Sequence, residues 1–215
     1  MSSMLNVMDE RLGLRERKKR ESRRRIADVA SGLFIERGFD NVTIAEVAEA
    51  ANVARMTVFN YFPRKEDLFL DRHADLVDDL RRAIRDRESG ESVVAAVRRY
   101  LHELLATQHP LSGAREGTQH FYQIVDASPA LVRRTLEHTR ELADALTELL
   151  ETEVGPGMEA AVVANLIATA VTIVPRVAVD KLIAGQPGEK VRREQVDVID
   201  QTFDLLEGGI GHYGS

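Results

Sequence analysis

The stretch TIAEVAEAANVARMTVFNYFPRK, residues 43–65, decides the fold, because it predicts two short helices joined by a tight turn. Thr43 is a good N-cap for the first helix, and Glu46 three residues later completes a capping box. Asn52 tolerates the left-handed backbone conformation that ends a helix and redirects the chain. The second helix, expected from about Arg55 to Phe62, is too short to be stable alone. The stretch therefore predicts a helix-turn-helix that packs against a further helix.

The second of these helices has an apolar side and a polar side. Val58 and Phe62 are expected to be buried, which leaves a guanidinium, hydroxyl, amide and phenol near the outer surface. These groups bond phosphates and base edges in the major groove of DNA. The predicted DNA-binding residues are Thr43, Arg55, Met56, Thr57, Asn60, Tyr61 and Lys65.

Residues 22–70 resemble the DNA-binding domain of the TetR family of bacterial transcriptional repressors. The resemblance includes the leader IADVASGLFIERGFDNVTI and the segment TVFNYFPRKEDLF. This sequence departs from the common family pattern at Asn52 and Ala54, where Gly and Ser are usual, and at Phe59, where Tyr is frequent. The resemblance implies an all-α protein of about nine helices, with a three-helix DNA-binding domain before a helical ligand-binding and dimerisation domain.

The resemblance also implies a mechanism. A homodimer binds a palindromic operator in double-stranded DNA, because two-fold symmetry doubles the few bases that one short helix can read. A small molecule in the C-terminal domain then moves a helix expected from about Lys65 to Arg87 and changes the separation of the DNA-binding domains. The expected protein is a repressor that such an effector releases.

The net charge of −6 is divided unevenly along the chain. Residues 1–65 carry +4 and residues 66–215 carry −10, and nine Lys or Arg residues lie between positions 11 and 25. We expect residues 1–20 to form a flexible basic arm that binds phosphates, the alternative being a solvated tail. Residues 21–66 are expected to form the DNA-binding domain and residues 67–215 the second domain.

The second domain has helical periodicity throughout, with Gly and Pro at the expected breaks and no strand-like alternation. Besides residues 65–87, helices are expected at about residues 92–108, 115–127, 128–153, 158–184 and 190–206. The helix at residues 158–184 is apolar around most of its circumference, which is more than one neighbouring helix would cover. We therefore predict a homodimer through residues 158–206 as a four-helix bundle, the alternative being a monomeric core.

A ligand pocket is expected among the helices of residues 65–153, lined by aromatic rings with polar groups. The candidates are His73, Tyr100, His102, Phe121, Tyr122 and His138. Arg176 is added because it follows Asn165, Thr169 and Thr172 on one stripe of an apolar helix, and an interior Arg needs an anion. That anion is either a carboxylate such as Asp126 or Asp180, or the acid group of a ligand. The expected effector is a lipophilic or aromatic acid, or an acyl thioester.

No catalytic residue, cofactor or metal site is predicted. The chain has no cysteine, so disulfides and thiolate metal sites are excluded. His102-Glu103 lacks the second His that a zinc-protease helix needs, since position 106 is Ala. No apolar run of transmembrane length is expected, which predicts a cytoplasmic protein that binds no membrane. Two other functions stay open: an enzyme or carrier with an added DNA-binding domain, and a DNA-bound adaptor that needs no ligand.

Overall fold

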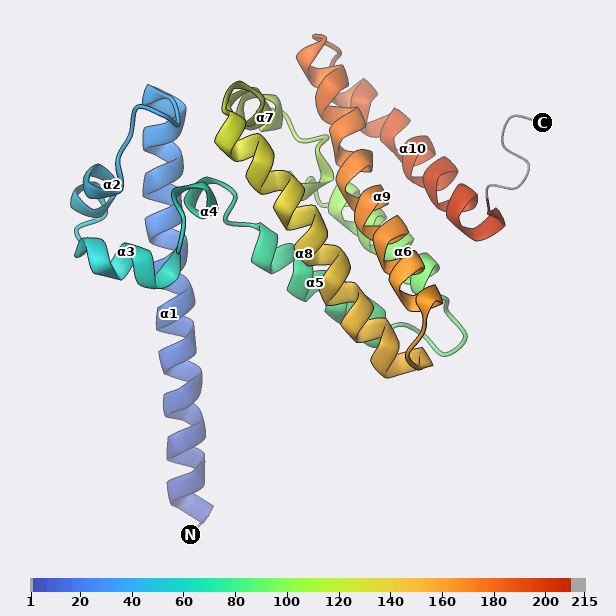
Figure 1. Cartoon of the computed structure of the whole chain (residues 1–215), viewed down its shortest axis with the longest axis horizontal. Helices are drawn as coiled ribbons and strands as arrows, with labels where there is room; N and C mark the ends of the chain where they lie inside the picture. The colour runs from blue at the N-terminus through green and yellow to red at the C-terminus, as the bar shows by residue number, and fades with distance from the viewer. Residues whose placement is uncertain (1, 210–215) are drawn as a thin grey trace. The chain divides into compact units, whose positions relative to one another are not determined.

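The computed structural model describes residues 2–209, and the side chains of residues 17–153 and 155–209. These residues form ten α-helices and one 3₁₀ helix, with no strand (Figure 1). The chain divides into two compact units, Met1–Asp71 and Arg72–Ser215. The predicted all-α fold is thus confirmed.

The smaller unit consists of α1 (Ser2–Arg37), α2 (Ile44–Ala50), α3 (Arg55–Tyr61) and α4 (Lys65–Phe69). α2 and α3 lie beside the C-terminal half of α1, whereas the N-terminal half of α1 extends beyond them (Figure 1). Three aromatic rings pack at the centre: the Phe34 ring lies 5.0 Å from that of Phe39 and 5.7 Å from that of Phe69. The same core buries Ile26, Ala30, Val42, Val47, Ala48, Val58, Phe62 and Leu68.

The predicted basic arm is part of α1, which is helical from residue 2. Its Lys, Arg and Glu residues have high intrinsic helix propensity, which agrees with a helical conformation here. One cation of this run has a structural role. Arg23 Nη2 donates to the carbonyl oxygen of Asp71 at 3.0 Å, and its guanidinium lies 4.8 Å from the centroid of the Phe62 ring. Phosphate binding by residues 1–20 stays a prediction.

The single helix predicted from about Lys65 to Arg87 is wrong, because it is interrupted after Phe69 and resumes as α5 (His73–Arg85). Leu68, Phe69 and Leu70 are all buried, and three successive residues of one helix cannot share a face. The break also frees the carbonyl of Asp71 to accept the hydrogen bond from Arg23. The boundary between the two units follows this break.

The larger unit continues from α5 with α6 (Val93–Ala106), the 3₁₀ helix η1 (Pro110–Ser112), α7 (Thr118–Ala127), α8 (Pro129–Val154), α9 (Met158–Ile183) and α10 (Gly188–Gly208). α8 and α9 run antiparallel to each other, and α10 packs against both α6 and α9 (Figure 1). Their shared core includes Leu80, Ile84, Leu101, Leu142, Leu146, Ile167, Val171 and Phe203.

The connection between η1 and α7 contacts the middle of α9. Gly113 has a φ of +73°, and a Cβ at this position would lie 2.2 Å from the carbonyl oxygen of Pro175. Pro175 is inside α9 and has no N–H to donate to the preceding turn. On the other side, the buried Gln195 of α10 donates from Nε2 to the carbonyl of Val174 at 2.7 Å. Three elements therefore meet around Pro175.

α9 is the most apolar helix of the described chain, and two of its properties bear on function. By length and composition it could cross a membrane, so the expectation that no apolar run has this length is wrong for residues 158–183. Half of its most apolar window is buried inside the unit, which is also what a core helix shows. Along the whole of α9, large apolar side chains are exposed: Met158, Val162, Leu166, Ile173 and Ile183.

Candidate functional site

The helix-turn-helix begins with the predicted capping box. Thr43 Oγ1 accepts from the backbone N–H of Glu46 at 3.3 Å, and Glu46 Oε2 accepts from the backbone N–H of Thr43 at 2.8 Å. Arg37 of α1 donates from Nη2 to the other oxygen of Glu46 at 2.5 Å. The N–H of Thr43 first, and then Arg37, lower the pKa of Glu46 to about 2. The Glu46 carboxylate thus accepts a backbone hydrogen bond at the start of α2 and links α2 to α1 through Arg37.

The turn is closed by backbone hydrogen bonds and by the predicted left-handed residue. Asn52 has a φ of +52°, as expected for the end of α2. Its N–H donates to the carbonyl of Glu49 at 3.0 Å, and the N–H of Val53 donates to that of Ala48 at 2.9 Å. α3 then starts without a side-chain cap and is held by the fully buried Val58. The short helix therefore depends on its packing for its position.

The outer side of α3 carries a mixture of polar and apolar groups. Arg55, Asn60 and Met56 are exposed, Met56 by 68%, whereas Thr57 and Tyr61 are half-buried. No ion pair to Arg55 occurs in the described part of the chain. An exposed guanidinium next to an amide and a thioether can contact both base edges and the thymine methyl group in a major groove.

Two of the predicted DNA-binding residues have structural contacts within the smaller unit. The ammonium of Lys65 donates to the carbonyl of Phe39 at 2.6 Å and lies 4.3 Å from the centroid of the Phe39 ring. Burial lowers the pKa of Lys65. The hydroxyl of Thr43 donates to Glu46 Oε2 at 2.8 Å. Both residues hold the fold together, and their contact with DNA stays a prediction.

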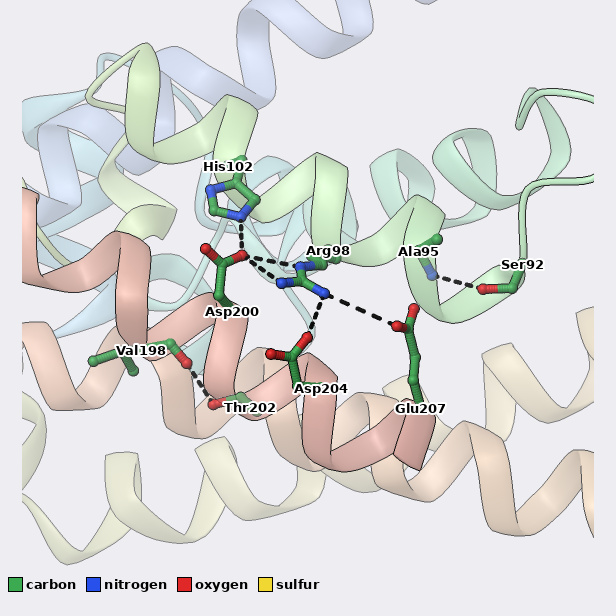
Figure 2. Close-up of polar contacts among 9 residues, drawn as sticks. All are labelled: Ser92, Ala95, Arg98, His102, Val198, Asp200, Thr202, Asp204 and Glu207. Atoms are coloured by element: carbon green, nitrogen blue, oxygen red, sulfur yellow. Dashed lines mark hydrogen bonds and ion pairs between the residues drawn. The ribbon is translucent and has the colours of Figure 1, made fainter. Parts of the chain in front are cut away.

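His102 does not face the predicted interior. Its Nε2 lies 2.9 Å from Asp200 Oδ1 of α10, on the side of α6 where Arg98 also contacts Asp200 (Figure 2). The physical reason is helical geometry: His102 is two residues from Tyr100, which places the two side chains about 200° apart around α6. Because Tyr100 faces the core, the side chain of His102 lies on the other side of α6.

The contacts of Arg98 and His102 form an ion-pair cluster between α6 and α10. Arg98 Nη2 lies 2.8 Å from Asp200 and its Nη1 lies 2.8 Å from Asp204, with Glu207 at 3.9 Å (Figure 2). The hydrogen bonds from Arg98 and then from His102 lower the pKa of Asp200. We assign this cluster to the packing of α6 against α10.

Three other predicted ligand-binding residues lie together where α7 meets α9. The rings of Phe121 and Tyr122 are in a T-shaped arrangement with centroids 5.4 Å apart, and the Arg176 guanidinium lies 5.6 Å from the Tyr122 centroid. Arg176 binds Asp126 through two hydrogen bonds of 2.8 and 2.9 Å and Asp180 through one of 2.7 Å. The carboxylates raise the pKa of Arg176, Asp126 most strongly. The anion expected for Arg176 was either a carboxylate of the chain or the acid group of a ligand. The structure shows the carboxylates of Asp126 and Asp180.

Tyr100 and His73 have different partners. Tyr100 is buried in the core of the larger unit, and burial, followed by the charge of Asp79, raises its pKa. The His73 ring of α5 stacks on that of His138 of α8 at 3.8 Å, with an angle of 3° between the ring planes. A cavity of about 520 Å³ lies elsewhere, among charged residues of the α5–α6 loop and Glu153, and is lined by none of the predicted residues. These contacts therefore do not join the predicted ligand-binding residues into a single aromatic wall.

The stacked histidines and Glu141 are a group that the sequence reasoning missed. His73 is far from His138 and Glu141 in the chain, and only the neighbourhood of His102 was considered for a metal ion. One signal was available: His138 and Glu141 are three residues apart, which places them on one face of α8.

Comparisons with known proteins agree on one family. Residues 26–71 match the family described as bacterial regulatory proteins, tetR family. Over 151 residues the chain is 26% identical to the HTH-type transcriptional regulator TcmR of Streptomyces glaucescens, covering 68% of this chain and 66% of TcmR. Over 100 residues it is 27% identical to the fatty acid metabolism regulator protein of Bacillus subtilis (strain 168), covering 45% of this chain and 52% of that protein. The chain thus matches somewhat less than two thirds of the first relative and about half of the second.

A solved structure extends the similarity over almost the whole chain. Thermus thermophilus FadR, a TetR family transcriptional repressor in complex with lauroyl-CoA, is 25% identical to this chain with a TM-score of 0.50. The alignment covers 90% of this chain and 97% of FadR.

Proposed function

Because the chain belongs to the TetR family of bacterial transcriptional regulators, we propose that it is a repressor whose homodimer binds a palindromic operator and is released by a small-molecule effector. The observation that carries the DNA-binding part is the outer face of α3. This face offers the exposed groups of Arg55, Met56 and Asn60, while the buried Val58 anchors the helix from behind. A regulator of this kind acts on chromosomal DNA, so we place it in the cytoplasm. The family is one of regulators, and the chain is not an enzyme.

The exposed apolar face of α9 supports the homodimer. Leu166 is 48% exposed and Ile173 is 54% exposed, and both lie on a helix whose other side is core. In α10, Val196 and Leu205 add further exposed apolar surface. Pairing residues 158–206 with a second copy would bury this surface in a four-helix bundle. The resulting two-fold symmetry would place two α3 helices on the half-sites of a palindrome.

The effector is proposed to be lipophilic, with acyl thioesters as the first class to test. The relative that is solved with lauroyl-CoA supports this class, and so do the neighbouring rings of Phe121 and Tyr122. The proposed ligand-binding residues are His73, Tyr100, Phe121, Tyr122 and Arg176. We no longer propose His102, because it contacts α10. An acid group that binds Arg176 must compete with Asp126 and Asp180, which already accept three hydrogen bonds from the guanidinium.

The first experiment is selection of binding sites from random DNA with the purified protein. A palindrome with two half-sites would support both operator binding and the dimer, whereas recovery of unrelated sequences would contradict the proposal. The selected palindrome then serves as the probe for effectors, with lauroyl-CoA, free lauric acid and CoA as matched ligands.

Effector binding is measured as release from that probe and as thermal stabilisation. A ligand at a hundredfold excess over its Kd stabilises the folded state by about 2.7 kcal/mol. If Arg176 recognises the effector, Arg176→Met removes the response to lauric acid and keeps the operator affinity. If Arg176 is an ion-pair partner only, Arg176→Met lowers the melting temperature and leaves the release by lauroyl-CoA intact. Arg193→Met, on the exposed side of α10, is the control.

A further inference from the structure

We propose that His73, His138 and Glu141 bind one divalent transition-metal ion, with Zn²⁺ as the fitting ion. One potential ligand atom of each residue lies within 4.8 Å of those of the other two. The residues come from two helices, His73 from α5 and the other two from α8. A site that joins two helices requires the folded unit, so the cluster is a property of the tertiary structure.

The distances in this cluster fit a zinc site. His73 Nε2 lies 3.5 Å from Glu141 Oε2. With bonds of about 2.1 Å and tetrahedral angles, two ligand atoms of one Zn²⁺ are about 3.4 Å apart. This distance is therefore close to the required length before the His73 ring turns. The other two pairs of ligand atoms lie at most 4.8 Å apart, and side-chain rotation can bring them to the required distance.

The two imidazoles must turn relative to each other to share an ion. Their rings are parallel at 3.8 Å, so their lone pairs lie in parallel planes and cannot converge on one ion. His138 is 8% exposed and held by packing, whereas His73 begins α5 and its side chain is 17% exposed. We therefore expect rotation of the His73 ring, at the freer end of the site, to complete the coordination.

Arg134 positions the carboxylate of this site. Its Nη1 donates to Glu141 Oε1 at 2.6 Å and to Glu137 Oε2 at 3.0 Å. Its Nη2 is farther from Glu141 Oε2, at 3.4 Å. The guanidinium thus holds both oxygens of Glu141, Oε1 more closely than Oε2, while Oε2 also lies 3.5 Å from His73 Nε2. Hydrogen bonds of this kind orient ligands in metal sites and strengthen binding.

The donor set selects the class of ion. Two imidazole nitrogens and one carboxylate suit Zn²⁺ and similar transition ions, whereas Mg²⁺ and Ca²⁺ prefer oxygen ligands only. Three protein ligands leave a fourth position of a tetrahedral zinc ion to water or to a polar atom of another molecule. Metal binding would join α5 to α8 within the larger unit. This inference is independent of the proposed function, because it needs neither DNA nor an organic effector.

The test uses the full-length, tag-free protein after treatment with a chelator. Titration with Zn²⁺ against a chromogenic chelator is expected to show one ion per chain, and Co²⁺ should give the visible absorption of a tetrahedral site. His73→Gln, His138→Gln and Glu141→Gln should each weaken Zn²⁺ binding by at least about tenfold, because even changes around the ligands cost that much. His120→Gln, at an exposed histidine of α7, should bind like wild type, and Mg²⁺ should not compete.

Three results would overturn the site: less than one ion per chain, variants that bind as tightly as wild type, or equal loss in His120→Gln. If a variant fails to fold, the wild-type protein still decides, because paramagnetic Co²⁺ must shift the NMR signals of the His73 and His138 rings. Signals that stay in place would refute the assignment. Operator binding is measured separately with and without Zn²⁺, so a protein that binds zinc but no palindrome refutes the proposed function alone.

Discussion

The two units expose different chemistry on the outer faces of α3 and α9. On α3 of the smaller unit, the outer face presents the guanidinium of Arg55 and the amide of Asn60. On α9 of the larger unit, the outer face presents the aliphatic side chains of Leu166 and Ile173. An exposed cation without an ion pair fits a phosphate-rich partner, whereas a row of exposed aliphatic groups fits another apolar surface. The difference indicates that each unit has its own kind of partner, and each can be disturbed separately.

The largest expected effect comes from charge on the apolar face of α9. The double substitution Leu166→Glu with Ile173→Glu should yield monomers and lower operator affinity by roughly 10²–10⁴-fold, because the second half-site loses its tethered partner. Analytical ultracentrifugation and anisotropy titration measure the two quantities. Charge at the buried Val171 or Phe203 would instead unfold the unit, so exposed positions are used.

The matched control places the same charge on an exposed apolar residue of the smaller unit. Ile35→Glu in α1 should leave the sedimentation of the dimer unchanged. A wild-type protein that sediments as a monomer at micromolar concentration would refute the assignment of α9 to dimerisation.

The second effect concerns the outer face of α3. Arg55→Ala should cost about 1–3 kcal/mol of operator binding and relax the preference at one base pair of each half-site. Arg55→Lys keeps the charge but loses the planar fork, so it separates base recognition from phosphate contact. If Arg55→Lys retains the base-pair preference, Arg55 contacts the DNA phosphate backbone and not a base. If Arg55→Ala binds the operator as tightly as wild type, Arg55 is not part of the DNA interface.

The third effect distinguishes Lys65 from Arg55 within the same unit. Lys65→Met should lower the stability of the smaller unit by about 1 kcal/mol, because the carbonyl of Phe39 loses a charged donor. Arg55→Ala should leave the melting temperature unchanged, since no ion pair in the described chain involves Arg55. Thermal denaturation followed by circular dichroism measures both. If Lys65→Met and wild type have the same melting temperature, Lys65 does not stabilise the unit and remains a candidate for a phosphate contact only.

The smallest effect is the pH dependence of the capping box. The pKa of Glu46 is lowered from 4.5 to about 2 in the folded state, so its stabilisation is complete above pH 4.5 and disappears as the pH falls toward 2. Glu46→Gln should therefore be less stable than wild type at neutral pH, and the two should converge in acid. Glu49→Gln, at the exposed end of α2, is the control. A difference that is constant from pH 7 to pH 2 would contradict this role of Glu46.

Local sequence patterns were sufficient to predict most of the helices and turns. The capping box of Thr43 and Glu46 and the positive φ of Asn52 were predicted correctly, because each depends on residues only a few positions apart. The family resemblance was confirmed for the same reason, since its residues are contiguous.

Long-range contacts were not predictable in the same way. In the break between α4 and α5, the carbonyl of Asp71 accepts a hydrogen bond from Arg23 of α1, which lies 48 residues earlier in the chain. Aromatic type alone grouped Tyr100 with His102, although helical geometry separates them. The stack of His73 on His138 follows from the packing of α5 on α8, which periodicity does not specify. Caps and turns within a short stretch of chain were therefore easier to predict than contacts between helices.

The contact of Gly113 with Pro175 constrains which substitutions the chain can accept over time. Any side chain at position 113 would meet the carbonyl of Pro175, whereas Gly117 has no atom within 4 Å of an added Cβ. Position 117 is thus restricted only by its backbone angle, and a residue such as Asn could replace its glycine. At position 113 a larger residue requires that the backbone of α9 withdraw first. In the descendants of this sequence, position 113 should therefore stay glycine for as long as the backbone of α9 keeps its place.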